Sequence, residues 1–185
     1  MKALLDRRKN PFFAHADAEY FLAERDGEVV GRIAAISNRL HNETHEDRVG
    51  FFGFFETIRD QAVASALLDA AGAWVRARGH DTLRGPASFS VNDECGLLVD
   101  GFQYPPALMM PHNPPWYLDL LTAAGFTTAK DLLVYQGGDE SVVSPVPERL
   151  ARGARLILGR HGVPLRTLEV RACEAEVERS KKPYN

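Results

Sequence analysis

An aromatic run, Val49-Gly50-Phe51-Phe52-Gly53-Phe54-Phe55-Glu56, precedes an alanine-rich segment from Asp60 to Arg78. The run is short, and its apolar residues fall on both faces of an extended chain, which predicts a central strand covered on both sides. In the alanine-rich segment, apolar residues recur at helical spacing, and Gly79 is a typical helix C-cap. Residues 81–85 predict a further strand. Strand, helix and strand with short connections together predict a parallel crossover.

The segments before this unit predict a hairpin. Tyr20–Ala23 and Val29–Ile36 are short, apolar and strand-like, and Asp26-Gly27 lies between them. Asp-Gly flanked by hydrophobic residues is a strong short-range hairpin signal. The polar residues 37–47, which come next, predict a loop that leads into the aromatic strand.

The segments after the crossover predict the rest of a first domain, a linker and a separate C-terminal part. Residues 114–124 predict a helix and 130–135 predict a fifth strand. We expect a first domain over residues 1–138 and a linker over 139–147. Residues 148–185 predict a basic helix, a strand and a short helix. The first part of the chain carries an excess of acidic side chains and the last part an excess of basic ones.

Composition excludes several classes of protein. The 185 residues are 45% hydrophobic and 25% charged, with a formal net charge of -3. These values are typical of a globular chain and give no basic field for general nucleic-acid binding. Two cysteines are too few for a disulfide framework. The sequence has no apolar stretch near the ~20 residues that span a bilayer and no signal-peptide pattern. We therefore expect a cytoplasmic protein with no membrane or nucleic-acid partner.

Several longer motifs carry a family resemblance. Residues 50–56, Arg84-Gly85-Pro86, Asn92–Phe102 and Met109–Pro115 resemble a group of bacterial proteins of the GNAT (acetyl-CoA N-acyltransferase) superfamily, and residues 117–126 resemble the last helix of that fold. The resemblance covers roughly residues 10–135. It implies an α/β (α+β) fold with a GNAT-like mixed, largely antiparallel central sheet, a parallel β-α-β crossover and flanking helices.

The resemblance also implies a site for acetyl-CoA or another acyl-CoA. It would lie beside the central strand, with its pyrophosphate at the start of the following helix, where backbone N–H groups and the helix dipole favour anions. This sequence departs from the family motif, because Ala62 replaces a glycine and Asp60 adds a negative charge. Alternatively, Asp60 only caps the helix. The residues predicted to bind the cofactor are Phe54, Phe55, Arg59, Gln61, Ala62, Val63, Ala64 and Asn113.

Two residues are predicted to be catalytic. Glu56 ends the central strand, where the resemblance implies a basic carboxylate that takes a proton from an amine. Its alternative is a solvated residue or a partner of Arg59. The family's acid is often a tyrosine at the position of Leu121, and the nearest tyrosine, Tyr117, lies one turn earlier. Tyr117 is predicted either to replace that acid or to pack and hydrogen-bond locally.

Polar residues between the second strand of the crossover and the last helix are candidates for acceptor binding. Carboxylates can recognise a cationic amine, and a histidine can titrate near neutral pH. The structural alternatives are that Asn92 or Asp93 caps a short turn and that His112 is a hydrogen-bonded loop residue. Asn113 is also a candidate N-cap. His41 and His45 lack a clear third ligand, so no metal site is predicted. The predicted acceptor residues are Asn92, Asp93, Glu94 and His112.

The resemblance implies one unusual feature of organisation. A GNAT domain normally begins with a strand and one or two helices before its hairpin, and the hairpin here begins by residue 20. Residues 164–171 look like such an opening strand, at the start of a second GNAT-like unit. We expect Leu165–Val170 to complete the first sheet, within the chain or exchanged in a homodimer, because an uncovered edge strand promotes aggregation.

The predicted function is acyl-CoA-dependent transfer of an acyl group to a small-molecule or peptide amine. The alternative is a catalytically degenerate GNAT-like binding module, which Asp60, Ala62 and Leu121 would favour. A third reading, a nucleic-acid accessory acting through the basic tail, would show salt-dependent binding.

Overall fold

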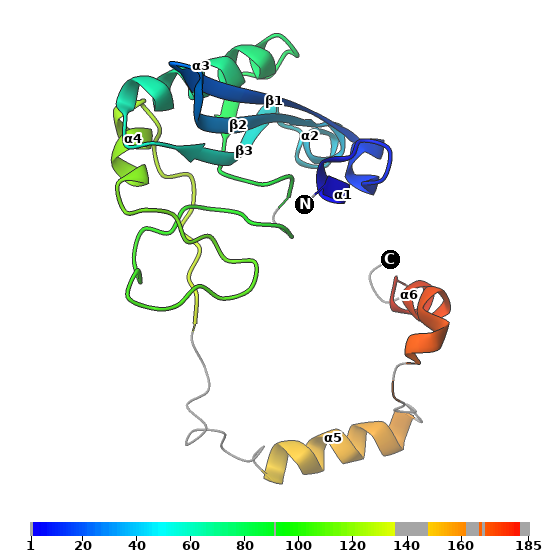
Figure 1. The fold of residues 1–185 in the computed structure, drawn as a ribbon. Coiled ribbons are helices and arrows are strands. Elements are labelled where there is room, and N and C mark those ends of the chain that lie inside the picture. Colours follow the sequence, from blue (N-terminus) through cyan, green and yellow to red (C-terminus); the bar gives the residue numbers. More distant parts are fainter. Residues whose placement is uncertain (1, 91, 136–147, 162–166, 168, 182–185) are drawn as a thin grey trace. The chain divides into compact units, whose positions relative to one another are not determined.

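The computed structural model describes residues 2–90, 92–135, 148–161, 167 and 169–181. The chain divides into two compact units, Met1–Leu133 and Val134–Asn185, and each is considered separately (Figure 1). The first unit contains a four-stranded mixed sheet with helices packed on it. The predicted fold class, GNAT-like with mixed α and β structure, is confirmed.

The sheet has the strand order β1-β2-β3-β4. The strands β1 (Ala16–Arg25) and β2 (Glu28–Asn38) form an antiparallel hairpin, and β2 also pairs antiparallel with β3 (Val49–Thr57). At the predicted turn, Asp26 and Gly27 have φ of 54° and 81°, which fits a two-residue hairpin turn. The short strand β4 (Thr82–Arg84) pairs parallel with β3, and α3 (Gln61–Arg76) connects them. The predicted hairpin and parallel crossover are both confirmed.

A β-bulge in β3 determines which face each aromatic side chain occupies. Between the pairs Ala34–Gly53 and Arg32–Glu56, β2 advances by two residues and β3 by three. The extra residue is Phe54, whose φ is 49°. Because of this insertion, Phe52 and Phe55 lie on one face although they are three residues apart.

The sheet separates two hydrophobic clusters. On one face, Phe52 and Phe55 pack with the buried side of α3 and with the helix α4 (Tyr117–Ala123). On the other face, Phe51 and Phe54 pack around Phe89 with side chains from the N-terminal segment. That segment forms α1 (Lys2–Leu5) and η1 (Pro11–Ala14). Coverage on both faces is what the aromatic run predicts for a central strand.

The chain that follows β4 stays close to β3. The backbone N–H of Ala87 donates to the Phe52 carbonyl at 2.7 Å. A Cβ on Gly53 would stand 2.1 Å from the Ala87 carbonyl oxygen, and one on Gly85 would stand 2.4 Å from the Phe52 carbonyl oxygen. Both positions therefore require glycine for this close approach.

Two predictions about local structure are wrong. The predicted loop 37–47 contains a helix, α2 (Arg39–His45), because the Asn38 side chain accepts from the His41 N–H as an N-cap. Residues 130–135 form no strand and have no regular secondary structure. No described strand pairs with this segment, so its apolar residues stay exposed, Leu133 at 75%. Strand-like composition does not make a strand without a partner.

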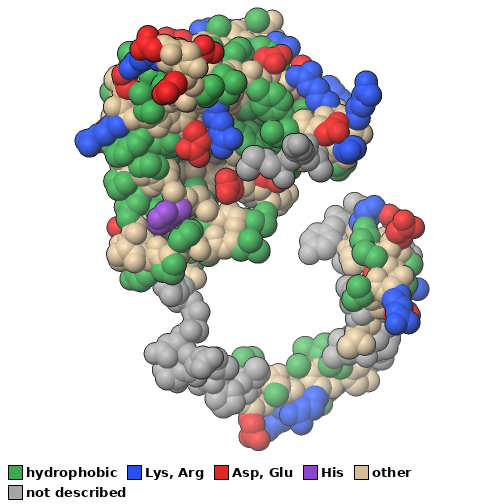
Figure 2. Space-filling model, in the orientation of Figure 1, with side chains coloured by type: hydrophobic (Ala, Val, Ile, Leu, Met, Phe, Trp, Pro, Cys, Tyr) green, Lys and Arg blue, Asp and Glu red, His purple; other side chains and the backbone are tan. Residues whose placement is uncertain are grey.

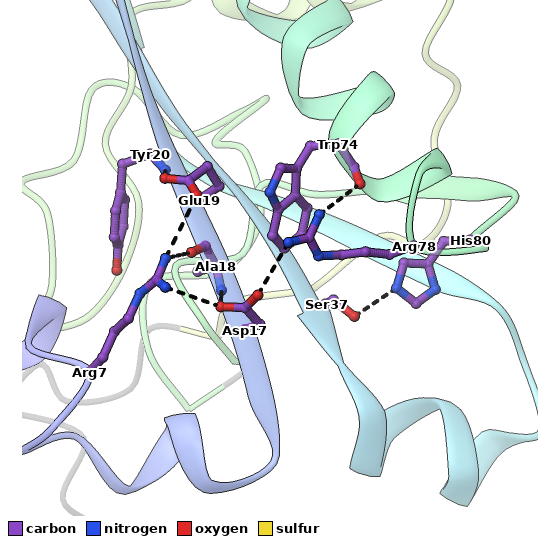
Figure 3. A network of polar contacts seen from close by, with 9 residues as sticks. All are labelled: Arg7, Asp17, Ala18, Glu19, Tyr20, Ser37, Trp74, Arg78 and His80. Carbon is purple, nitrogen blue, oxygen red and sulfur yellow. Dashed lines mark hydrogen bonds and ion pairs between the residues drawn. The ribbon is translucent and has the colours of Figure 1, made fainter.

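Among the described residues, charged side chains rather than another strand lie along the free edge of β1 (Figure 3). Arg7 donates to the Ala18 carbonyl and lies 3.6 Å from Asp17 and 3.9 Å from Glu19. The edge N–H groups of Ala18 and Tyr20 donate to the Asp17 and Glu19 carboxylates at 2.9 and 3.3 Å. These contacts occupy polar groups of the edge and place charges along it, which disfavours the addition of a further strand.

The second unit contains α5 (Glu148–His161), η3 (Val170–Ala172) and α6 (Cys173–Lys181). The helix α5 coincides with the predicted basic helix. The predicted strand 164–171 lies largely outside the described residues, and its last two residues belong to η3. The proposals that it completes the sheet or is exchanged in a homodimer, and the predicted domain boundaries, stay predictions.

Candidate active site

Glu56 and Tyr117 meet at the end of the central strand. The Tyr117 hydroxyl donates to Glu56 Oε2 at 2.9 Å and accepts from the backbone N–H of Thr57 at 3.1 Å. Glu56 is the next-to-last residue of β3, and Tyr117 begins α4. The two predicted catalytic residues, 61 positions apart, are therefore in direct contact.

The two residues differ sharply in their surroundings. Tyr117 is only 3% exposed and packs edge-to-face against Phe55. Burial, followed by its contact with Glu56, raises the pKa of Tyr117 from 10.0 to about 12. The Glu56 side chain is 60% exposed, and its Oε1 lies 3.9 Å from the Arg32 guanidinium. The site thus consists of the accessible Glu56 carboxylate and the buried, neutral Tyr117 that donates a hydrogen bond to it.

This arrangement favours Glu56 as a base more than Tyr117 as an acid. Glu56 presents an oriented, solvent-accessible carboxylate, which can accept a proton from a bound group. Tyr117 is a weak acid at a pKa of about 12. Its hydroxyl already donates to Glu56 and accepts from the Thr57 N–H. Its contacts match the local packing that is the alternative reading of this residue.

At the start of α3, the carboxylate of the protein's own Asp60 occupies the predicted anion site. Asp60 is the N-cap, and its Oδ1 accepts from the N–H groups of Ala62 and Val63 at 2.8 and 3.4 Å. Its other oxygen lies 3.0 Å from Arg25. The hydrogen bond from Arg25, followed by those from the helix backbone, lowers the pKa of Asp60. The capping role that the sequence predicts as an alternative for Asp60 is therefore present.

The other residues predicted to bind the cofactor lie in different environments. Arg59 is exposed, whereas Val63 and Ala64 lie on the buried face of α3. The Gln61 side chain donates to the Leu120 carbonyl at 3.1 Å, which joins α3 to α4. The bulge residue Phe54 donates its N–H to Ser88 Oγ at 3.2 Å. A ligand at these backbone groups would have to replace Asp60 and Ser88 as their partners.

Asn113 is a structural residue in this fold. Its Oδ1 accepts from the Leu98 N–H at 2.7 Å, and its Nδ2 donates to the carbonyls of Leu98 and Pro114. The N-cap position of α4 is taken by Trp116, without a side-chain cap hydrogen bond, so the N-cap reading of Asn113 is wrong. The Asn113 amide instead joins Leu98 to the segment that leads into α4, and its predicted role in cofactor binding stays a prediction.

The predicted acceptor residues are not joined to Glu56 by any hydrogen bond or ion pair among the described residues. Asp93 accepts from Ser90 Oγ at 2.8 Å and thereby closes a tight turn, as its alternative reading predicts. Asn92 and Glu94 are exposed on the same turn, and His112 is exposed in the later loop. Their role in acceptor binding stays a prediction.

Two further features lie outside the predicted catalytic and cofactor residues. His41 and His45 stack on α2 with ring centroids 4.4 Å apart, and His41 lies 3.3 Å from Asp47. The described part of the chain holds no group of three side chains arranged to bind a metal ion. A pocket of about 280 Å³ lies between α3 and β4, lined by residues such as Asp69, Arg76 and His80, and it includes none of the predicted site residues.

Sequence reasoning missed two residues of the site. Arg32 faces Glu56 because the two are directly paired across β2 and β3, and Ser88 contacts the bulge. The pairing of Arg32 could have been found only by aligning the hairpin with β3, and that register depends on the bulge. No sequence signal marks Ser88.

Comparison with known proteins assigns this architecture to a class. Residues 2–85, which contain the entire sheet and α3, match the Acetyltransferase (GNAT) family. This match agrees with the motifs, so the predicted resemblance to the GNAT superfamily is confirmed over residues 2–85.

Two individual curated proteins are also similar to this chain. The chain is 37% identical over 176 residues to the bacterial ceramide synthase of Caulobacter vibrioides, which covers 94% of this chain and 44% of that protein. It is 39% identical over 127 residues to Protein YghO of Escherichia coli, covering 69% of this chain and 33% of that protein. The chain thus spans less than half the length of either relative. No solved structure matches it. None of the described helices combines the length and apolar character needed to cross a bilayer.

Proposed function

We propose that this chain carries the acyl-transfer site of an N-acyltransferase that moves an acyl group from acyl-CoA to the amine of a lipid-like acceptor. Membership of the GNAT superfamily supports acyl transfer, and acyl-CoA is the general co-substrate of that family. The observation that carries the proposal is the exposed Glu56 carboxylate, oriented by Tyr117 at the end of the bulged central strand.

The proposed reaction uses Glu56 as the base. The amine nitrogen attacks the thioester carbonyl carbon, the new C–N bond forms, and the C–S bond breaks. Glu56 takes the proton that the nitrogen loses and passes it on, through solvent, to the departing thiolate. A free thiol has a pKa of about 8.5, so the thiolate is protonated near neutral pH without a dedicated acid. Tyr117 then serves as a positioning residue.

The acceptor class follows from a relative. The Caulobacter protein is named a ceramide synthase, and a ceramide is the amide of a long-chain amino alcohol. Since that match extends over 94% of this chain, we propose that the acceptor here is also a long-chain primary amine. The acyl-CoA would lie beside Phe54 and Phe55, with its pyrophosphate near Arg59 and the first turn of α3.

The proposal is tested by assaying amide formation from acyl-CoA and a panel of amines, followed by mass spectrometry. Glu56→Gln keeps the size of the side chain and removes the base, so turnover should fall by about 10²–10⁴-fold. The matched control is Glu43→Gln, an exposed position on α2. Equal turnover in the two variants would exclude Glu56 as the base. A wild-type chain that binds acyl-CoA but acylates no amine would instead indicate the degenerate binding module.

A further inference from the structure

One face of the sheet is covered over only half of its length. Phe12, Phe13 and Phe89 cover the part that contains Ala18 and Ile36. Beyond this cover, three apolar side chains remain exposed, and we call them the outer strip: Tyr20 at 36%, Leu22 at 66% and Val29 at 60%. The visible surface of this unit likewise shows hydrophobic side chains interspersed with charged ones (Figure 2).

The outer strip lies on the same face as Glu56. The register pairs Leu22 with Arg32, and Arg32 with Glu56, so these three residues form one row across the sheet. Directly paired residues project to the same face. Tyr20 and Glu24 lie two residues before and after Leu22 on β1, so they share its face. Val29 is paired with Glu24 and therefore lies on this face as well.

The row has a fixed length. Neighbouring strands are about 4.8 Å apart, so Leu22 lies about 10 Å across the sheet from the strand that carries Glu56. An alkyl chain whose amine sits at the Glu56 carboxylate would therefore reach the outer strip only if it extends about 10 Å across the sheet. A short amine would not reach it.

We propose that the outer strip binds the alkyl chain of a long-chain primary amine whose amino group lies at Glu56. This inference rests on the proposed function and assigns residues to its acceptor. A carboxylate next to uncovered apolar surface is complementary to an amphiphile with a cationic head. Arg32, which lies between them, supplies N–H donors to an oxygen near the amine, as in an amino alcohol.

The alternative occupant, a protein partner, fits this surface less well. Three side chains provide far less than the ~800 Å² that each partner buries in a stable interface. The edge of the sheet beside the strip also carries Arg7, Asp17 and Glu19, whose charges disfavour the addition of a partner strand there.

The test uses the full chain with hexylamine, dodecylamine and hexadecylamine below their aggregation concentrations. Burying one methylene contributes enough free energy for a change of about fourfold, so kcat/KM should rise steeply from hexylamine to dodecylamine. Leu22→Gln should lower kcat/KM for dodecylamine by about tenfold and for hexylamine by less than about twofold. The matched control is Leu40→Gln, another exposed leucine, which lies on α2.

A second readout separates this inference from the proposed function. Long-chain amines should raise the Tm of the wild-type chain and of Leu40→Gln, but not of Leu22→Gln, whether or not turnover occurs. If no amine is acylated, the proposed function fails, and the Tm series still decides whether the strip binds alkyl chains. Equal chain-length dependence in the two variants, or none in the wild type, overturns the inference.

Discussion

At the scale of single residues, the hydroxyl of Tyr117 joins the candidate site to the fold. It satisfies the Thr57 N–H at the end of β3 and at the same time orients the Glu56 carboxylate. Because a buried donor without a partner is costly, this hydroxyl stabilises the structure as well as the site. Burial, together with the Glu56 contact, raises the pKa of Tyr117 to about 12 and keeps it neutral over a wide pH range.

Tyr117→Phe should therefore lower the free energy of unfolding by about 1–2 kcal/mol at neutral pH. The folded-state pKa of about 12 lies above the ordinary 10.0, so the contribution is fully present below pH 10 and is lost as pH rises through about 12. Urea unfolding across this range should show the difference between wild type and variant shrinking. A similar loss in Tyr104→Phe, at an exposed tyrosine, would contradict this account.

Asp60 is the residue whose charge opposes the proposed cofactor. Asp60→Ser keeps a side-chain oxygen for the N-cap and removes the negative charge at the start of α3. If the pyrophosphate lies there, acetyl-CoA should bind about threefold to fivefold more tightly at low salt. Calorimetric titration measures the change, and Asp69→Ser, on the same helix, provides the control. Unchanged affinity in Asp60→Ser would place the pyrophosphate elsewhere.

At the scale of elements, the sequence predicted the crossover and the hairpin well because both depend on local patterns. The burial of β3 on two faces is visible in its aromatic residues, and the Asp26-Gly27 turn is local. The bulge at Phe54 is not visible, because it depends on pairing with β2. The contact between Glu56 and Tyr117 joins residues far apart in the chain, and only the packing of α4 brings them together.

The edge of β1 gives a prediction about association. Arg7→Ala removes the group that pairs with the Ala18 carbonyl and bridges Asp17 and Glu19, leaving the edge more open. Stability should change by less than about 1 kcal/mol, because exposed ion pairs contribute little. Association should increase with protein concentration, measured by light scattering. Arg8→Ala is the control, since Arg8 is the exposed neighbour. Equal association in both variants would show that Arg7 does not protect the edge.

At the scale of the whole molecule, the two units differ in how much core they contain. Both hydrophobic clusters lie within the first unit. In the second unit, α5 exposes Leu150, Leu156 and Ile157 at 57–60%. Each relative is more than twice as long as the part of it that matches this chain. The proposed activity is therefore inferred from a match to only a fraction of each relative.

A chain of residues 1–135 should therefore unfold cooperatively with a Tm close to that of the full chain. A peptide of residues 148–181 should show little helical signal alone, since isolated helices of ~12–15 residues are marginal in water. Circular dichroism of the two pieces and of the full chain measures both. Loss of cooperative unfolding in residues 1–135 would show that the first unit depends on the second.

The bulge in β3 has a consequence for insertions and deletions. In a regular strand, removal of one residue exchanges the faces of every residue beyond it. Here the pair Gly53 and Phe54 already occupies the space of one, so removal of Phe54 would leave Phe55 towards α3 and Glu56 on the opposite face. Position 54 is thus where this strand can change its length while the carboxylate keeps its orientation.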